Sequence, residues 1–430
     1  MKKLLLTLCL VALSTSFAWT DDTVYCSPYG ISVSTNPSDG DSWNNTLTPS
    51  GISTYLNGNH CRLITNPGVL TIYILKGDYY DDLIINASTI SNLISLGYVT
   101  SVNIYGSCSG NNNELLNQRD FENGRSVFHA ASGNCPIWLD FGSATHGNIC
   151  VVDGLWIDSY DGNQYQTINE YAMRLVGGNY IISHCTIQDF KTTNSILFLE
   201  GGNEYFRLVN SVITGDEAEH LLDVYGSLQI INSTIAKLEL GDKLIGISMA
   251  NHTYRIDNSI IYDCSNYVSC YGYPFDIRNS IIRTYDSSWM VDYGNNYWNT
   301  DPAFTGYPTA PYSCQASSVA MGNGAVANYT ALSFMLNLLV VLYDADNHFR
   351  FDDYSLSRID IGAYQTYSGG NYYYQNALAP NPMQAPQRQT EVIDEIADDD
   401  ASGMVYNLLG QPVDESYHGI VIKNGQKVLQ

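Results

Sequence analysis

The sequence is poor in charged residues and especially poor in basic ones. Charged residues make up 14% of its 430 residues, whereas about 25% is usual for a soluble domain. The 19 Lys and Arg residues face 43 Asp and Glu residues, which gives a formal net charge of −24. Such a surface repels phosphate backbones, so we expect no nucleic acid partner.

Several catalytic and membrane signatures are also missing. The sequence holds no Gly-x-Ser-x-Gly elbow, no phosphate-binding loop, no HExxH motif and no CxxC pair, so serine hydrolase, nucleotide, zinc protease and zinc ribbon functions have no support. After the N-terminal segment, the best apolar run covers residues 332–343 and is interrupted by Asn337. That run is too short to cross a bilayer, and we expect no membrane span.

The N-terminus is typical of a signal peptide. Lys2 and Lys3 precede an apolar core at residues 4–13, and Ser16 and Ala18 provide the small residues of a cleavage site. We therefore expect residues 1–18 to be removed and the protein to be secreted or held on the outer cell surface. Export permits disulfides among the ten cysteines, and Cys264 with Cys270 is the closest pair. Buried thiols that act as small apolar residues are the alternative for most of them.

An internal repeat determines the predicted fold. Four anchors, each an Asn followed by Ser, have Leu or Ile two positions before and Ile three positions after, and they lie 22, 26 and 21 residues apart: Asn210, Asn232, Asn258 and Asn279. Short β-branched runs at this spacing predict the stacked coils of a β-solenoid from about residue 60 to about residue 300. The register extends to His184, and a weaker copy at Val151, Asp153 and Gly154 would place Trp156 inside the tube.

The anchors have a predicted structural role. Stacked Asn side chains at a bend can satisfy turn backbone groups and bond to the Asn of the next coil. We expect such a ladder rather than a ligand site, and His184 occupies one of its positions.

Four local motifs resemble a known family, the right-handed parallel β-helix surface proteins of Bacteroidetes-type bacteria with a pectate-lyase-like fold and a choice-of-anchor ending. They are residues 23–25 with 39–43, residues 102–106 with Gly110 and 119–120, residues 301–304, and Asp344, Asp346 and Arg350 with residues 360–365. The last motif ends in Gln365 where the family has Glu. The resemblance implies export and an all-β, right-handed parallel β-helix over residues 19–366, including an N-terminal cap and a C-terminal closing region. It implies no single activity.

The C-terminal part is expected to be separate. Residues 367–401 form a predicted linker with an acidic run from Glu391 to Asp400. Residues 402–430 contain two short strand patterns and an Asn-Gly hairpin signal, which predict a small β-sandwich-like domain. They are similar to the C-terminal sorting domains of type IX secretion, which would make the secretion machinery a partner. An accessory β-domain is the alternative.

Candidate ligand contacts gather in and around the coils. Arg207, Arg255 and Arg278 precede three anchors, and we expect a nearly in-register basic row that would contact anionic groups of a glycan; ion pairs with neighbouring acids are the alternative. Asp216 and Glu217 open an acidic cluster after a predicted strand, where paired acids would serve catalysis or bind Ca²⁺, or would simply be solvated. Tyr160 and Tyr165 are candidates for packing on sugar rings.

Two functions fit these patterns. The first is an exported cell-surface β-helix protein that recognises a polysaccharide, or cleaves it as a polysaccharide lyase or glycoside hydrolase. The second is a non-catalytic surface adhesin or structural protein. The sequence identifies no catalytic residue and no metal ligand. It indicates no cofactor, apart from Ca²⁺ as an alternative for the acidic cluster.

Overall fold

The chain divides into two units, residues 1–385 and residues 386–430. The computed structural model describes residues 22–32, 40–57, 61, 63, 68–86, 98–111, 119, 121, 124–130, 133–142, 148–247, 252–265, 273–283, 287–306, 310–326, 344–345, 359–365, 367–368, 371–372, 405–407, 412–413, 420–423 and 426–429. The predicted signal peptide at residues 1–18 lies outside this set, as does most of the predicted linker. The boundaries expected at 366 and 401 stay predictions.

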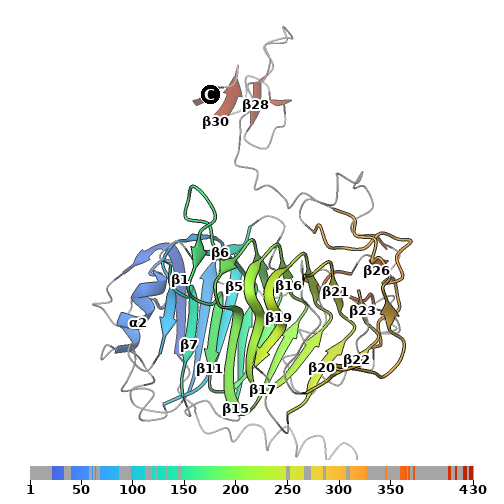
Figure 1. The fold of residues 1–430 in the computed structure, drawn as a ribbon. Helices are drawn as coiled ribbons and strands as arrows, with labels where there is room; N and C mark the ends of the chain where they lie inside the picture. Colours follow the sequence, from blue (N-terminus) through green and yellow to red (C-terminus); the bar gives the residue numbers. More distant parts are fainter. Residues whose placement is uncertain are drawn as a thin grey trace, which may run out of the picture. The chain divides into compact units, whose positions relative to one another are not determined.

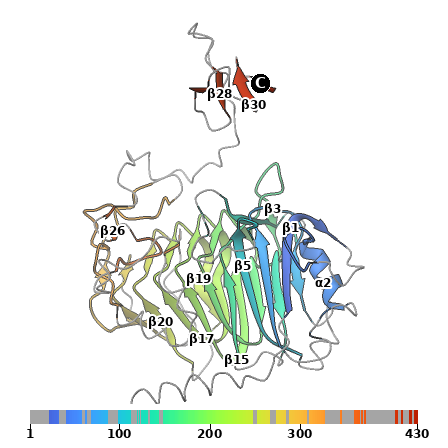
Figure 2. The same cartoon turned by 180° about the vertical axis from the view of Figure 1, so that it is seen from behind.

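The first unit is a parallel β-helix, as predicted. Its strands stack coil upon coil from the N-terminal helix α2 (Pro49–Asn57) to the closing region (Figures 1 and 2). All strand pairs of the stack are parallel, in one 16-stranded sheet and one 9-stranded sheet. Parallel crossovers of this kind are right-handed.

Each coil contributes strands to three walls, because the long strands β15 and β17 pair with different neighbours along their two halves. Wall A1 contains β4 (Leu83–Ile85), β7 (Ile137–Asp140), β11 (Met173–Val176), the first halves of β15 (Ser195–Val209) and β17 (Glu217–Ile231), and β19 (Glu239–Ile247). Two short strands, β10 (Thr167–Ile168) and β14 (Lys191–Thr192), precede this wall.

Wall A2 contains β1 (Asp22–Ile31), β2 (Gly68–Leu75), β5 (Val99–Cys108), β8 (Ile149–Asp153), β12 (Asn179–Ser183), the second halves of β15 and β17, β20 (Tyr254–Asp257), β22 (Phe275–Arg278) and β24 (Met290–Asp292). Wall B is the 9-stranded sheet: β3 (Gly77–Tyr79), β6 (Ser126–His129), β9 (Leu155–Asp158), β13 (Thr186–Gln188), β16 (Val212–Thr214), β18 (Thr234–Ala236), β21 (Ile260–Tyr262), β23 (Ile281–Ile282) and β25 (Tyr297–Trp298).

Columns of Ile, Leu and Val from all three walls fill the tube. Ile187, Ile213, Ile235, Ile261 and Ile282 pair in register along wall B, and each is at most 2% exposed. At the N-terminal end, α2 packs against β1 and β4 and buries Ile52 and Leu56. The inward Ile columns were read correctly from the repeat.

One part of the predicted register is wrong. Gly154, with φ of +74°, takes the turn position of the weaker copy, because its N–H donates to the Ser183 carbonyl at the step before His184. The pattern is therefore shifted by one residue, and a one-residue shift exchanges the two faces of a strand. Trp156 points outward, where the Arg125 guanidinium lies 4.6 Å from its ring centroid.

The Asn anchors occupy the sharp turn between walls A2 and B. His184, Asn210, Asn232, Asn258 and Asn279 all have φ between +44° and +50°, a left-handed conformation that Asn tolerates better than most residues. Asn258 Nδ2 donates to Asn232 Oδ1 at 3.3 Å, which is the ladder contact expected from the repeat.

The Ser that follows each Asn makes a more regular ladder. The hydroxyl groups of Ser211, Ser233, Ser259 and Ser280 each donate to the carbonyl two residues earlier. Each also accepts the backbone N–H of the residue stacked on it in the preceding coil, at 3.1–3.3 Å. The turn is therefore cross-linked mainly through Ser, a role that the sequence pattern alone did not reveal.

A closing segment, residues 304–326 with 344–345 and 359–365, packs on the outer face of wall B from β16 onward. It buries Ala310, Tyr312, Cys314, Ala320 and Ile361 against outward residues of that wall. Asn232 Nδ2 donates to the Asp360 carbonyl at 3.1 Å, and Gly362 N–H donates to the Asn258 carbonyl at 2.8 Å. The motif at residues 360–365 therefore packs on the Asn ladder and hydrogen-bonds to two of its residues.

Two positions in this motif explain its composition. Gly362 has φ of +99°, and a Cβ there would lie 2.7 Å from the Ile260 side chain, so only Gly fits. Gln365 Oε1 accepts the Asp360 N–H at 3.0 Å. The Gln that departs from the family pattern thus stabilises the motif through its amide oxygen.

The eight described cysteines after the signal segment are buried free thiols: Cys26, Cys61, Cys108, Cys135, Cys150, Cys185, Cys264 and Cys314. Cys264 is therefore not part of a loop staple, and Cys270 lies outside the described residues. Burial raises the pKa of the Cys264 thiol to about 12, which makes these thiols behave as small apolar residues.

The second unit contains one four-stranded antiparallel sheet among its described residues, with the order β29 (Pro412–Val413), β28 (Val405–Asn407), β30 (Ile420–Lys423) and β31 (Gln426–Leu429). In the β30–β31 hairpin, Lys423 pairs with Gln426, and the Asn-Gly turn predicted between them lies outside the described residues. A separate short hairpin joins β26 (Tyr367–Ser368) and β27 (Asn371–Tyr372). No described helix is long and apolar enough to cross a membrane.

Candidate functional site

The three arginines predicted as a basic row share the outward face of wall A2 but do not form one row. Arg207 and Arg255 lie in the same row, with Gln229 between them. Arg278 pairs with Asp257 in the neighbouring row, because it precedes its anchor by one residue and the others by three. The in-register prediction is wrong for this residue, although all three face outward.

Each of these arginines is already engaged. Arg207 is 8% exposed, and burial lowers its guanidinium pKa. Arg255 pairs with the buried Asp257 carboxylate at 3.0 Å, and the Arg278 guanidinium lies 4.6 Å from the Tyr293 ring centroid. The alternative expected for this set, ion pairing with neighbouring acids, describes Arg255.

The side chains of the two predicted acids point in opposite directions, Asp216 into the core and Glu217 toward solvent. Asp216 is fully buried; its Oδ1 accepts the Phe190 N–H at 2.7 Å. Burial raises the pKa of this carboxyl well above its ordinary value, with a further rise from Asp189. A solvated turn position for Asp216 was the wrong expectation, because the residue falls in a column with the inward Phe190 and Leu238. Glu217 is exposed and meets Lys191 Nζ at 2.5 Å.

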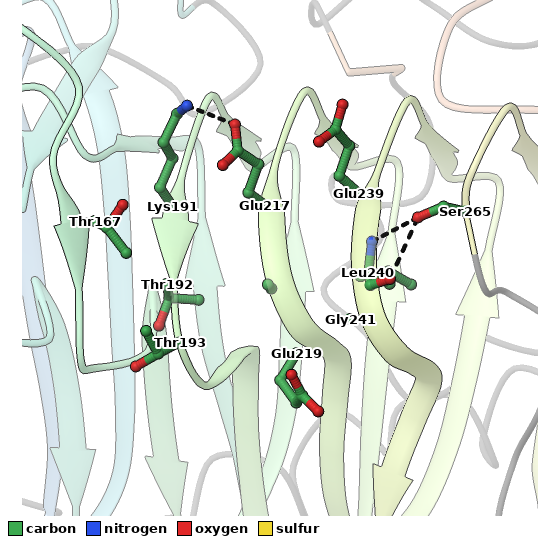
Figure 3. A pocket seen from close by; sticks show the side chains of 11 residues that line it. Thr167, Lys191, Thr192, Thr193, Glu217, Glu219, Glu239, Leu240, Gly241 and Ser265 are labelled. Carbon is green, nitrogen blue, oxygen red and sulfur yellow. Dashed lines mark hydrogen bonds and ion pairs between the residues drawn. The ribbon is translucent and has the colours of Figure 1, made fainter.

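Glu217 and Lys191 line an open groove where β14, β17 and β19 begin (Figure 3). The groove has a volume of about 640 Å³, and Glu219, Glu239 and Ser265 also line it. Figure 3 shows Lys191, Glu217 and Glu239 side by side on successive strands, with Glu219 further along β17. No group of three metal-binding side chains is found among the described residues, so these acids do not form a preassembled Ca²⁺ site there.

An aromatic surface missed by the sequence reasoning lies on the outward face of wall A1. Trp138, Arg174, Phe198 and Asp223 pair in register on β7, β11, β15 and β17, while the residues on either side of each point into the core. The Arg174 guanidinium lies between two rings, 4.6 Å from the Trp138 centroid and 5.0 Å from the Phe198 centroid.

Two tyrosines widen this surface, which we call the A1 aromatic row (Trp138, Tyr171, Arg174, Phe198, Asp223 and Tyr225). The ring centroid of Phe198 lies 4.9 Å from that of Tyr171 and 5.6 Å from that of Tyr225. Partial burial raises the pKa of both phenols, and Asp223 raises them further. All six side chains are partly exposed, so the row combines ring faces with a cation and an anion.

Polar atoms in this row lack hydrogen-bond partners. Trp138 Nε1, Arg174 Nε and Asp223 Oδ1 are shielded from bulk solvent, and none bonds to another protein group. Buried polar atoms are nearly always satisfied in native proteins. Two donors and one acceptor of the row are therefore unsatisfied and covered, so a ligand would reach them only after side chains move. A signal was present in the sequence, since Ile137, Leu139, Met173 and Leu175 alternate with these residues, but it lies in coils that carry no Asn anchor.

Tyr160 and Tyr165 are placed elsewhere, on a hairpin that follows β9 in wall B. Their ring centroids are 5.4 Å apart, and their backbones form an antiparallel bridge. The structure brings these two predicted sugar contacts together, but on a different wall from the A1 aromatic row. It brings none of the three arginines to either surface.

Similarity between this chain and known proteins is low. No protein-family model matches the chain, and no curated protein matches it. One solved structure, described as the crystal structure of pectate lyase Pel9A, is similar at 15% sequence identity with a TM-score of 0.34. The match covers 82% of this chain and 98% of that one.

Proposed function

We propose that this protein recognises polysaccharide on the outward face of wall A1. The observation that carries the proposal is the row Trp138–Arg174–Phe198, in which two ring faces flank a guanidinium on an open sheet. Sugar rings present C–H faces that pack on aromatic rings and hydroxyl groups that need donors and acceptors. The partly exposed Arg174 and Asp223 side chains place a donor group and an acceptor group beside the rings.

The spacing of the row suits a linear chain. Adjacent coils of a parallel sheet lie about 4.8 Å apart, which is close to the length of one pyranose residue. A glycan running along the solenoid axis would therefore meet a new side chain at each coil, from Trp138 on β7 to Asp223 on β17.

Recognition without cleavage fits the described groups better than catalysis. The lysines on or beside this wall are held by carboxylates: Lys191 Nζ lies 2.5 Å from Glu217 Oε1, and Lys243 Nζ lies 2.6 Å from Asp242 Oδ2. Arg174, in the row itself, lies between two rings. A non-catalytic surface role, in binding or adhesion, is therefore the second candidate function.

The test is a panel of plant and host glycans applied to the full chain, scored for binding and for unsaturated or reducing-end products. Trp138→Ala and Phe198→Ala should each weaken binding about tenfold, the equivalent of about 1.4 kcal/mol. Tyr293→Ala removes an exposed ring on wall A2 and should change nothing. Equal loss in all three variants, or no binding by the parent protein, would remove the support for wall A1.

Export and surface display belong to the same proposal. The support is the leader-like sequence at residues 1–18 and the sorting-like pattern at residues 402–430, which belongs to a separate compact unit. Deletion of residues 402–430 should leave a folded β-helix in the periplasm of a host with type IX secretion. Arrival of the truncated protein at the cell surface would refute the sorting role.

A further inference from the structure

A second chain of rings lies on the N-terminal part of wall B. Tyr80 stacks on His129 at a centroid distance of 4.7 Å, and His129 meets the edge of Tyr160 at 6.0 Å. Tyr165 continues the chain beyond Tyr160. His129 is 1% exposed, whereas Tyr80 is 48% exposed and Tyr165 is 40% exposed. The tyrosine rings thus surround a buried imidazole at the protein surface.

His129 is held between two carboxyl groups. Its Nδ1 lies 2.6 Å from Asp158 Oδ1, and its Nε2 lies 3.1 Å from Asp78 Oδ1. A neutral imidazole donates from one nitrogen only, so the second carboxyl contact requires either a protonated ring or a protonated carboxyl group. The Asp78 side chain is 56% exposed, so this group presents a carboxyl to solvent.

A further acid lies in the same turn. Asp161 stands between Tyr160 and Tyr165, and its carboxylate accepts the N–H groups of Gln164 and Asn163, which lower its pKa. Two described cations, Lys76 and Arg125, directly precede β3 and β6, and Arg125 lies over Trp156 and donates to Thr186. Arg125 precedes β6, whereas His129 ends it, so the ring cluster is at the acidic end of the strand.

We propose that Tyr80, Tyr160, Tyr165, Asp78 and Asp161 form a second binding site, which takes a saccharide bearing a free primary amine. Aromatic faces attract cations, and an exposed carboxylate gives an ammonium group a charge-assisted hydrogen bond. The same carboxylates repel uronic acids. The choice of an amino sugar over a lysine side chain rests on the glycan recognition proposed for wall A1.

The probes are tetramers of glucosamine, N-acetylglucosamine and galacturonic acid, with trilysine as a peptide amine. Binding to the full chain is measured by titration calorimetry at fixed ionic strength. The glucosamine tetramer should bind at least tenfold more tightly than the other three probes. Equal binding of the acetylated tetramer, equal or tighter binding of trilysine, or no binding of the glucosamine tetramer would each overturn the proposal.

Matched variants separate this site from the general attraction of a chain with net charge −24 for cations. Asp78→Asn and Tyr165→Ala should each weaken glucosamine binding five- to tenfold. Asp41→Asn changes an exposed acid elsewhere, and Tyr29→Ala removes a ring that is 95% exposed; both should leave binding unchanged. If all four variants lose affinity equally, binding is nonspecific and the site is refuted.

One more variant keeps the two proposals apart. Trp138→Ala should leave the affinity for the glucosamine tetramer unchanged, because it alters wall A1 alone. Loss of glucosamine binding in this variant would assign the amine to wall A1 and refute the wall B site. Loss of other glycans in the same variant would still support the proposed function.

Discussion

Val127 and Val212 occupy the same outward column of wall B on different coils, linked in register through Trp156 and Thr186. Val212 is 1% exposed and packs against Ala310, Tyr312 and Ala363 of the closing segment. Val127 is partly exposed, and its neighbours Asp78 and Trp156 are polar or amphipathic. The N-terminal and C-terminal coils therefore share one inner core and differ in what their outer faces meet.

The outer face of wall B therefore has different roles in the C-terminal and the N-terminal coils. In the C-terminal coils, the closing segment converts the outer face of wall B into a second apolar core. In the N-terminal coils, no described residue of the closing segment packs on this face, and it carries Arg125, Trp156, His129 and the tyrosines. A surface freed from packing can carry rings and charges that a ligand would contact.

The largest expected difference between the two sets of coils is in the free energy of unfolding when the same substitution, Val to Ala, is made in each. Val212→Ala removes two methyl-sized groups from a packed interface at about 0.8 kcal/mol per group, and the cavity adds to this. We expect a loss of about 2–3 kcal/mol in the free energy of unfolding, measured by urea denaturation. Val127→Ala should cost less than about 1 kcal/mol. Equal losses would show that the two halves are equally covered.

The sequence predicted the part of the fold that the repeat dictates. The turn was predicted from Asn210, Asn232 and Asn258, because few other residues tolerate φ near +50°. The core was predicted from the flanking Ile residues. The N-terminal coils were harder to place because Gly154 takes the turn without an Asn. The repeat alone therefore misplaced Trp156 by one residue.

The candidate sites were predicted less well than the fold. The A1 aromatic row is assembled from strands 24 to 36 residues apart, such as Ile137–Asp140, Met173–Val176 and Ser195–Val209, and no local motif marks it. Tyr160 and Tyr165 stood out by composition, but Tyr80 and His129, which complete their cluster, come from two earlier coils. Register between coils is a tertiary property, so side chains that meet across them cannot be read from a single coil.

The two halves also treat buried carboxyl groups in opposite ways. Asp153, in the N-terminal coils, contacts the Arg119 guanidinium and lies 2.7 Å from His184 Nδ1. Its pKa is lowered although burial opposes the shift, because Arg119 and His184 outweigh the loss of solvation. Asp216, in the C-terminal coils, has no described cation partner, and its Oδ2 has no hydrogen-bond partner. Its pKa is raised by burial.

This contrast also gives an expected effect that depends on pH. Because burial raises the folded-state pKa of Asp216 above its ordinary value, the folded protein holds this proton more tightly than the unfolded chain. Its contribution to stability is complete below about pH 4 and is lost as the pH rises toward the folded-state pKa.

Asp216→Asn removes that loss, since an amide resembles the protonated acid and its Oδ1 can still accept the Phe190 N–H. The variant should match the parent near pH 4 and exceed it at pH 7, by about 1.4 kcal/mol for each pKa unit of the shift. Urea unfolding of both proteins between pH 4 and pH 8 measures the difference in their free energies of unfolding. The pKa values of Asp189 and Asp276 are also raised, so these residues give both proteins a similar dependence of stability on pH. Taking the difference between the two proteins removes that shared dependence. A variant that is less stable than the parent at pH 7 would mean that Asp216 is ionised and has a partner in the folded protein.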